Sequence, residues 1–381
     1  MRILLGTQNI ASVLGEMQNA FNKLGHETTL FVHERPANIV KKTVYDYVIS
    51  EQIFFLFREK WFANKRGIIH TFFRKFSSTI RKVLIQRQSR KLLSKLIEDH
   101  DVFIFIWHSI LYNYRDLAEI KKAGKKIVFI FCGDDVRWYW SMKKEFEDLG
   151  MVPVEYGSEY DYSKKGLRQR LRRIKAAEKF ADIIYSKREQ AQLQTRPFFH
   201  WPMFVDTIQN VGVISVQNEK PLILHAPTNY SGKGSEYIIE SLKRIKKNGI
   251  AFKMKLIQNL DHEKAIEEYA KADIIIDQLF VPGGGRLTSE ALLLGKVVAT
   301  NMSYGLYDQG NLAQLPEVCP VFHIDKFNLD KQLTHLISNV SLRQRLSDQS
   351  IPYALKYLGV NEFAKKIIQN ISLQSNPEYF P

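Results

Sequence analysis

The residues best suited to chemistry lie in the stretch VPGGGRLTSEALLLGKVVAT. Its three glycines, Gly283, Gly284 and Gly285, follow a predicted strand at Ile274–Ile276 and precede a predicted helix at about residues 287–294. A strand, a glycine loop and a helix in this order direct backbone N–H groups and the positive end of the helix at an anion. Glycine also allows a close approach of the backbone to a phosphate. The pattern predicts a phosphate-binding loop, and its structural alternative is a flexible connection.

The helix after the glycine loop carries one carboxylate, Glu290, which is predicted to lie in the first turn. There it can accept two hydrogen bonds from a vicinal diol such as that of a ribose. The alternative is that this charge only stabilises the N-terminus of the helix. Thr288 and Arg286 complete the polar residues that we assign to the same ligand.

A second loop of the same kind occurs in LHAPTNYSGKGSEYIIESL. Lys233 lies between two glycines, after a predicted strand at Leu222–His225 and before a helix that starts at about Ser235. A lysine there can neutralise a phosphate while the helix end supplies N–H donors, although a surface lysine in a turn is the simpler reading. Because both loops follow strands, they are expected to meet at the carboxyl edge of one parallel sheet.

The first half of the chain offers weaker candidates at the ends of its predicted strands. Gly6 and Asn9 follow a strand at residues 3–5, and could approach an acceptor or form a plain turn. His108 follows the strand at residues 102–107 and is a candidate catalytic group, with a structural role as the alternative.

Two aspartates and an arginine follow the predicted strand at residues 127–131. Asp134 or Asp135 could position an acceptor hydroxyl as a catalytic carboxylate, and Arg137 could bind an acceptor phosphate. A capping carboxylate and a surface ion pair are the structural alternative.

Short apolar runs alternate with amphipathic stretches, which predicts an α/β protein with parallel sheets built from βαβ units. We expect an N-terminal domain at residues 1–205, a linker at 206–220, a second domain at 221–350 and a final helical region at 351–381 that packs back on the first domain. The expected strands are residues 3–5, 28–32, 102–107, 127–131, 183–185, 222–225, 253–257, 274–276 and 297–299.

The composition limits the classes of protein. The 381 residues suffice for two domains, and two distant cysteines, Cys132 and Cys319, argue against a disulfide scaffold or a zinc site. The N-terminus reads as a strand rather than a signal peptide, and no run approaches the roughly 18 apolar residues of a membrane span. These features predict a cytoplasmic protein.

The formal net charge of +15 predicts an anionic partner. Residues 54–96 mix aromatic side chains with Lys and Arg, as in segments that lie on anionic membranes, so peripheral binding to the inner face of the cell membrane is one expectation. The alternative is an ordinary helix with a solvated basic face and an apolar stripe, which consists of Phe72, Phe73, Phe76, Ile80, Val83 and Leu84.

The second half resembles the C-terminal domain of GT-B glycosyltransferases, close to the retaining family 4 type (glycosyl transferases group 1). The resemblance depends on HAPTNYSGKGSEYIIESLKRI and on YAKADIIIDQLFVPGGGRLTSEALLLGKVVAT, in this order and spacing. In the first half, KKIVFIFCGDDVRWYW and KFADIIYSK resemble the family more loosely. The resemblance implies two Rossmann-like domains that face each other across a cleft, with a C-terminal helix crossing back.

The resemblance also implies a nucleotide-sugar donor, for which we expect a UDP- or GDP-sugar, and no bound metal or further cofactor. Lys233 matches the family's diphosphate-binding lysine, and Glu290 matches the glutamate that holds the ribose. Pro282 stands where the family often has a second glutamate, and Thr228 and Pro227 stand where an arginine is common. We therefore hypothesise that Arg286 supplies the missing positive charge.

The predicted function is transfer of a sugar to a hydroxyl of a glycan or lipid-linked acceptor, with retention, in the synthesis of a surface polysaccharide or glycolipid. A nucleotide-sugar epimerase on the same scaffold is the first alternative. A basic nucleic-acid-binding protein is the second, but no helix-turn-helix, zinc or RNP signature is present, so we expect no nucleic-acid partner.

Overall fold

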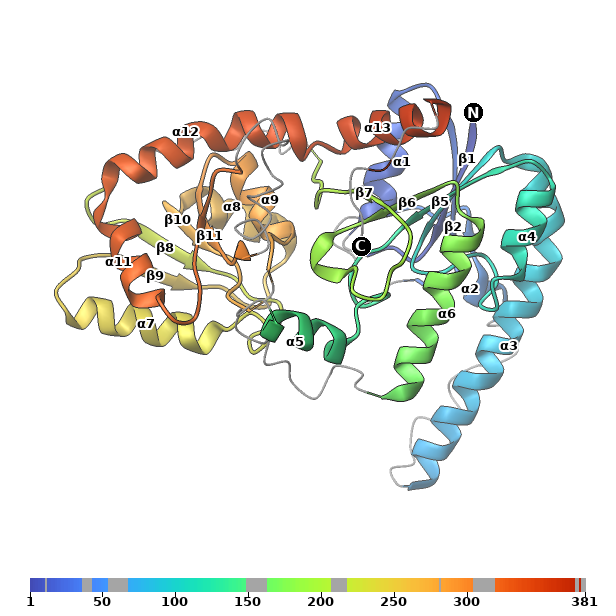
Figure 1. Ribbon diagram of the computed structural model, residues 1–381, viewed down its shortest axis with the longest axis horizontal. Helices are drawn as coiled ribbons and strands as arrows, with labels where there is room; N and C mark the ends of the chain where they lie inside the picture. Colours follow the sequence, from blue (N-terminus) through green and yellow to red (C-terminus); the bar gives the residue numbers. More distant parts are fainter. Residues whose placement is uncertain are drawn as a thin grey trace.

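The chain consists of two lobes, which lie side by side in the computed structural model (Figure 1). The structure describes residues 1–10, 12–35, 43–53, 68–148, 163–206, 218–280, 282–303, 319–373 and 377, without the side chains of residues 68–79. The part from 54 to 67 of the predicted basic segment lies outside the described residues.

The N-terminal lobe is built on a parallel sheet, which has seven strands among the described residues, in the order β3-β2-β1-β4-β5-β6-β7. Its central strands are nearly continuous apolar runs, such as VFIFI in β4, because helices cover both faces of the sheet. The strands are β1 (Arg2–Thr7), β2 (Glu27–Val32), β3 (Tyr47–Val48), β4 (Val102–Ile106), β5 (Lys126–Ile130), β6 (Ile183–Ser186) and β7 (Phe199–His200).

The helices of this lobe divide between the two faces of the sheet. Side chains of α1 (Val13–Lys23) and α13 (Val360–Leu373) share one apolar core with one face. Side chains of α3 (Ile68–Asp99), α4 (Arg115–Lys122) and α6 (Lys164–Phe180) share the other. The described residues of this lobe also form two short elements, namely α2 (Ile49–Ile53) and a 3-10 turn, η3 (Arg188–Gln190).

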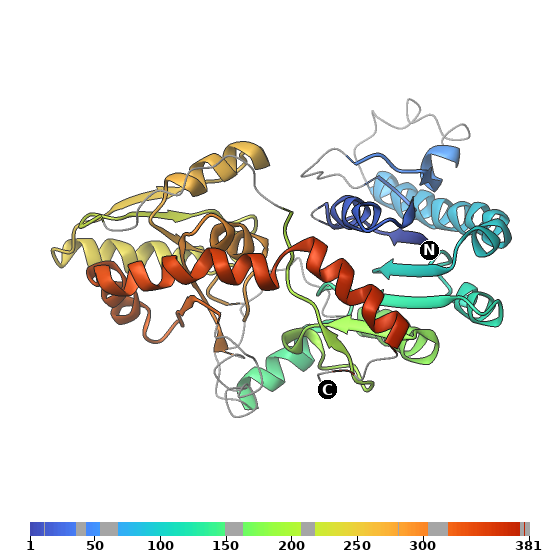
Figure 2. The same ribbon diagram turned by 90° about the horizontal axis from the view of Figure 1, so that it is seen from above.

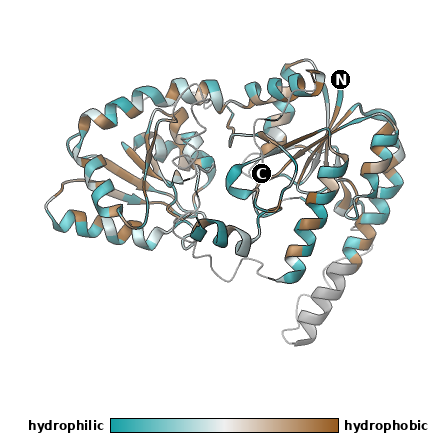
Figure 3. Cartoon of the chain, in the orientation of Figure 1, coloured by the Kyte–Doolittle hydropathy of each residue, from teal (hydrophilic) through white to brown (hydrophobic). Residues whose placement is uncertain are grey.

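The C-terminal lobe has a second parallel sheet, of five strands within the described ranges, in the order β12-β11-β10-β8-β9. The strands are β8 (Leu222–His225), β9 (Lys253–Leu256), β10 (Ile274–Ile276), β11 (Val297–Thr300) and β12 (Val321–His323). The helices around them are α7 (Ser235–Lys247), α8 (His262–Lys271), α9 (Arg286–Leu293), α11 (Leu329–Ser338) and α12 (Val340–Tyr357). Hydrophobic residues predominate along the strands, whereas hydrophilic and hydrophobic residues alternate along the helices (Figure 3).

The final helix crosses back to the first lobe, as predicted (Figures 1 and 2). The crossing lies further along the chain than expected. Helix α12 continues through Pro352 to Tyr357, and the helical path is interrupted at Leu358 and Gly359. Beyond the break, Phe363 and Ile367 of α13 are buried in the core of the N-terminal lobe. The C-terminal helix therefore ties the two lobes together by burying apolar surface.

A second connection between the lobes was not predicted. Helix α5 (Tyr139–Asp148) follows a strand of the N-terminal sheet, yet its Met142 and Phe146 belong to the apolar core of the C-terminal lobe. The short strands β3, β7 and β12 were also absent from the expected set.

The predicted apolar stripe of the basic helix is wrong in part. Val83 is 53% exposed, whereas Ile85, Leu93 and Leu96 of α3 face the core. The members before residue 80 lie outside the described side chains.

Replacing Phe363 with Ala tests the docking of α13. Phe363 is 3% exposed and lies 5.1 Å, between ring centroids, from both Phe204 and Tyr185. The substitution should lower the free energy of unfolding by about 3–5 kcal/mol, as is typical when a buried aromatic ring is truncated. Unfolding in guanidinium chloride measures the change. Leu373→Ala, at a 67% exposed position of the same helix, should leave the midpoint nearly unchanged; equal midpoints for the two variants would contradict the docking.

Candidate functional site

The carboxylate of Asp277 joins the two predicted ligand-binding loops. Asp277 follows β10 directly and is fully buried. One of its oxygens pairs with the ammonium of Lys233, from the loop after β8. The other accepts hydrogen bonds from the Gly285 amide, at 3.0 Å, and the Thr288 hydroxyl, at 2.7 Å. Lys233 and the glycine loop therefore meet at one carboxylate, at the carboxyl edge of the second sheet.

These partners decide the charge of Asp277. Burial by itself would raise its pKa, but the ammonium of Lys233, the Thr288 hydroxyl and the Gly285 amide outweigh burial, so the pKa lies below its usual value. Asp277 is an anion at neutral pH, and it balances the charge of Lys233. An ammonium has three N–H donors, so Lys233 can keep this bond and still donate to a ligand.

The backbone of the loop depends on two of its glycines. Gly283 has a φ of +86°, which side-chain-bearing residues rarely adopt, and its amide donates to the Asn301 carbonyl at 2.7 Å. A Cβ on Gly284 would lie 2.5 Å from Cγ2 of Thr288. The loop thus lies directly against the first turn of α9, whose leading amides have no acceptor within the helix.

Glu290 lies in the second turn of α9, not in the first turn as predicted, because the helix begins at Arg286. The Glu290 side chain is 4% exposed. Its Oε1 accepts from Nε of Arg286 at 2.7 Å, and Nε2 of His262, on α8, lies 2.7 Å from the same oxygen. No described residue bonds to its Oε2. The pKa of the buried Tyr269, on α8, is raised by burial and then by the charges of Glu290 and Asp277.

Arg286 connects the two lobes. Its terminal nitrogens donate to both carboxylate oxygens of Glu16, on α1 of the N-terminal lobe, at 2.6 and 3.1 Å. Burial would lower the pKa of Arg286, but Glu16 and Glu290 outweigh burial and raise it. The charge of Arg286 is thus balanced by two carboxylates, and its predicted role against a diphosphate stays a prediction.

The candidates near the first strand serve the fold of the N-terminal lobe. Gly6 lies within β1 rather than after it, and a Cβ there would lie 2.8 Å from the Phe31 carbonyl oxygen. Asn9 is buried, donates to the Tyr45 hydroxyl at 2.8 Å and accepts from the Leu14 amide at 3.0 Å at the start of α1. Both residues are fully engaged in local packing.

The loop after β5 is held by Asp135. One oxygen of this buried carboxylate accepts from the amides of Cys132, at 3.0 Å, and Gly133, at 2.7 Å. Burial raises the pKa of Asp135 to about 6. Asp134 is half exposed and pairs with Arg137 at 2.9 Å. This arrangement matches the structural alternative of a capping carboxylate and an ion pair, while a role toward an acceptor stays a prediction.

His108 lies at the same edge of the N-terminal sheet, with its ring between Tyr114 and Arg173. Nδ1 is 3.1 Å from the Tyr114 hydroxyl, and Nε2 is 3.3 Å from a guanidinium nitrogen of Arg173. Burial, and then the charge of Arg173, lowers the pKa of His108 to about 2. A histidine that is neutral at all ordinary pH values is a weak proton acceptor in catalysis.

Sequence reasoning gave no role to Asp277, Glu16 or His262. Asp277 had a readable signal, since it is a carboxylate at the end of a predicted strand. Glu16 had a fainter one, because it lies among the apolar positions Met17 and Ala20 on the buried face of α1. His262 had none, since its partner lies 28 residues away.

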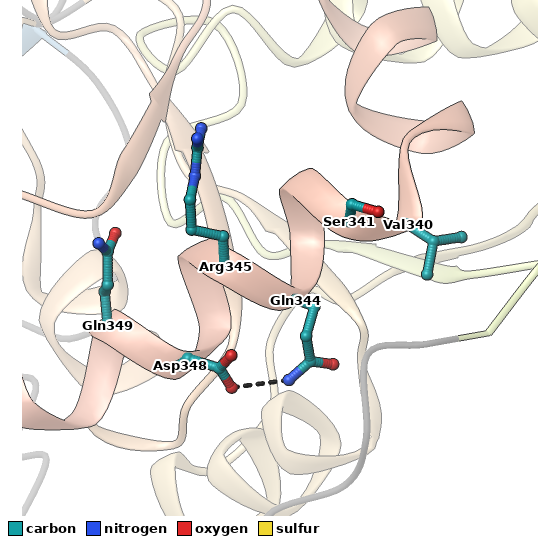
Figure 4. Close-up of a pocket in the computed structure, with 6 residues that line it drawn as sticks. All are labelled: Val340, Ser341, Gln344, Arg345, Asp348 and Gln349. Carbon is teal, nitrogen blue, oxygen red and sulfur yellow. Dashed lines mark hydrogen bonds between the residues drawn. The ribbon is translucent and has the colours of Figure 1, made fainter.

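A surface pocket lies apart from all of these residues, along one side of α12 (Figure 4). It is lined by Val340, Ser341, Gln344, Arg345, Asp348 and Gln349. Within the described ranges there is no cluster of three or more His, Cys, Asp or Glu side chains that could hold a metal ion.

No protein-family model matches the chain, and no curated protein matches it in sequence. Solved structures match it along nearly its whole length. A TarM variant from S. aureus, in complex with fondaparinux, α-GlcNAc-glycerol and UDP, is similar over 97% of this chain and 99% of its own, with 9% identity and a TM-score of 0.59. An α-glucosyltransferase in complex with UDP and DNA covers 97% of this chain and 99% of its own, with 13% identity and a TM-score of 0.52.

A third match is a Listeria monocytogenes protein described as a UDP-N-acetylglucosamine 2-epimerase. It covers 100% of this chain and 99% of its own, with 12% identity and a TM-score of 0.53. Together these matches confirm the predicted fold: the chain has the GT-B architecture of two Rossmann-like domains. The assignment to family 4 stays a prediction.

The raised pKa of Asp135 predicts a pH dependence of stability. The folded chain binds this proton more tightly than the unfolded chain, in which the pKa is about 3.8, so the contribution of Asp135 to stability falls as pH rises from about 4 to about 6. Asp135→Asn cannot titrate. The unfolding temperature of the unaltered chain minus that of Asp135→Asn should therefore fall across this range and level off above it.

Thermal unfolding of both chains between pH 4 and 8 measures this difference. Asp134→Asn, which removes the neighbouring half-exposed carboxylate, is the matched control. If the difference in unfolding temperature between the unaltered chain and Asp135→Asn does not change with pH, the pKa of Asp135 is not raised in the folded chain.

Proposed function

We propose that the chain is a glycosyltransferase, which moves a sugar from a UDP- or GDP-sugar to a hydroxyl of a glycan or lipid-linked acceptor, with retention. The processes that use such a reaction are the synthesis of cell-surface polysaccharides and glycolipids. The observation that supports the proposal most directly is the meeting of Lys233 and the glycine loop at Asp277, with Glu290 close by on α9. This arrangement offers donors for a diphosphate and an acceptor for a ribose hydroxyl within one site.

In the proposed reaction, the bond between the anomeric carbon and a phosphate oxygen breaks, and a bond to the acceptor oxygen forms. The proton of the acceptor hydroxyl passes to the departing phosphate oxygen. Negative charge grows on the leaving diphosphate, through an oxocarbenium-like transition state. The remaining N–H donors of Lys233 and the leading amides of α9 would stabilise this charge, without a metal ion. Asp277 keeps these donors in place before the substrate arrives, so no reorganisation is needed during the reaction.

The acceptor side is proposed to be the edge of the N-terminal sheet, where the Asp134–Arg137 pair and His108 lie. Within the pair, half of the Asp134 side chain is exposed, whereas the Arg137 side chain is 14% exposed. Arg137 could bind a phosphate of a lipid-linked acceptor by changing partner from Asp134.

An epimerase is the second candidate, because one of the matched structures is described as a 2-epimerase. The reaction would need acid and base groups at the sugar. Of the groups described here, His108 is neutral and enclosed, and Asp135 is bound to its own loop. Release of an isomerised nucleotide-sugar without an acceptor would favour this candidate.

The donor prediction is tested with UDP-, GDP-, ADP- and dTDP-sugars in a thermal-shift panel. A bound donor at 100 times its dissociation constant should add about 2.7 kcal/mol to the stability of the chain. With the nucleotide that binds, Lys233→Ala should weaken affinity by about 10- to 100-fold, because a charged hydrogen bond contributes about 1.5–3 kcal/mol. Calorimetry measures the affinity.

Lys247→Ala removes an exposed lysine from the last turn of α7 and is the charge-matched control. It should leave affinity unchanged. Equal affinities for Lys233→Ala and the unaltered chain would remove the support for a diphosphate at this site, and failure of every nucleotide-sugar to bind would end the proposed function.

We also propose that the chain associates with an anionic membrane through the outer faces of α3 and α6. No helix in the described ranges is long and apolar enough to cross a bilayer, so this association would be peripheral. The two helices pack on the same face of the N-terminal sheet. Their exposed basic residues are Arg81, Lys82, Arg87, Arg90, Lys91 and Lys95 on α3, and Lys164, Lys165, Arg168, Arg172, Lys175 and Lys179 on α6.

Cosedimentation at low salt with phosphatidylglycerol and with phosphatidylcholine vesicles tests this proposal. The chain should bind only the anionic vesicles, and replacement of Arg168, Arg172, Lys175 and Lys179 by Gln should remove most of the binding, since each basic residue near the surface contributes about 1 kcal/mol. A matched variant replaces Lys243, Lys246, Lys247 and Lys253 on the other lobe, which are equally exposed. Equal binding by both variants, or none by the unaltered chain, would rule out this surface.

A further inference from the structure

We infer that Glu16, on the N-terminal lobe, is a positioning residue for the donor site: through Arg286 it orients Glu290 toward the ribose of the donor. The inference rests on the proposed function and names a residue 270 positions away from its partner in the sequence. It also predicts what the site distinguishes, namely a ribonucleotide from its 2′-deoxy form.

The charged side chains of Glu16, Arg286 and Glu290 are largely buried. The side chains of Glu16 and Glu290 are 2% and 4% exposed, and that of Arg286 is 14% exposed. A buried charge is costly unless it is paired and hydrogen-bonded. One guanidinium between two carboxylates contributes to meeting this requirement, so the position of Glu290 depends in part on Arg286, and that of Arg286 in part on Glu16.

The guanidinium of Arg286 can transmit an orientation because it is planar. Its two terminal nitrogens form a fork with both oxygens of Glu16. The fork sets the plane, and the plane sets the direction of Nε, which donates to Oε1 of Glu290. A lysine ammonium has no fixed fork and could not transmit an orientation in this way.

The two oxygens of Glu290 differ in their protein partners. Both protein donors, Arg286 and His262, bind Oε1. No described residue binds Oε2, which leaves this oxygen for a hydroxyl of the ribose. Without Glu16, the fork of Arg286 has a second carboxylate within reach, four residues further along the helix, and would turn to hold both oxygens of Glu290. Glu16 therefore keeps Arg286 from occupying the acceptor that the ligand needs.

Calorimetry on the full chain tests the inference, with UDP and 2′-deoxy-UDP as probes, and with GDP and 2′-deoxy-GDP if the chain binds guanine nucleotides. The unaltered chain should bind the ribonucleotide roughly tenfold or more tightly than the deoxy form, the size expected for a hydrogen bond to a charged group. Glu16→Ala and Arg286→Lys should bring this ratio close to one. Glu16→Gln, which keeps the shape and one acceptor, should retain an intermediate ratio.

The matched control is Asp330→Ala, which removes the carboxylate of another Arg–carboxylate fork, with Arg244 at 2.7 and 2.8 Å, between α7 and α11. It should keep the ratio of the unaltered chain. Because Glu16 is buried, far-UV circular dichroism and unfolding temperatures accompany each variant, and Arg286→Lys and Glu16→Gln decide the outcome if Glu16→Ala does not fold.

Two results would overturn the inference. A ratio in the folded variants equal to that of the unaltered chain, with or without an equal weakening of both nucleotides, would show that Glu16 does not orient Glu290. A ratio near one in the unaltered chain would show that Glu290 does not bind the 2′-hydroxyl. If the unaltered chain binds neither member of any pair, the proposed function itself fails, and this inference fails with it.

Discussion

The structure of the candidate site depends on a buried carboxylate that must be satisfied. Asp277 has no access to water, so its negative charge needs partners from the protein, and those partners come from two different loops. Lys233, the Gly285 amide and the Thr288 hydroxyl are thereby placed around one point. The same interaction sets the start of α9, and hence the position of every residue on that helix, including Arg286 and Glu290.

The two lobes are connected by interactions of different kinds. Helix α13 and the α5 side chains Met142 and Phe146 bury apolar surface across the boundary, which stabilises association without specifying an orientation. The Arg286–Glu16 fork adds direction, because a bidentate pair is satisfied in one relative geometry. A buried ion pair contributes little net stability by comparison with apolar packing. Its value here is the alignment of the two lobes at the proposed donor site.

The same scaffold is found in glycosyltransferases and in a protein described as a nucleotide-sugar epimerase, so the fold alone does not decide the reaction. The N-terminal edge shows how polar residues at strand ends can serve the fold. Asn9 starts a helix, Asp135 holds a loop, and His108 is neutral within a cluster of aromatic and basic side chains. The donor edge differs, since Glu290 retains an oxygen without a protein partner in the part of the chain that the structure describes.

The sequence by itself determined the alternation of strands and helices, the division into two α/β lobes, the crossing of the last helix, and the two loops with Lys233 and the glycines, because periodicity and glycine spacing are local signals. It also predicted that Glu290 lies on the helix after the glycine loop, although in the first turn of that helix rather than the second. Tertiary structure alone decided which polar side chains form hydrogen bonds within the fold, and that α5 packs on the other lobe. It also decided that Arg286 pairs with Glu16 and that His262 contacts Glu290. These outcomes depend on burial, and burial is set by residues that are far apart in the chain.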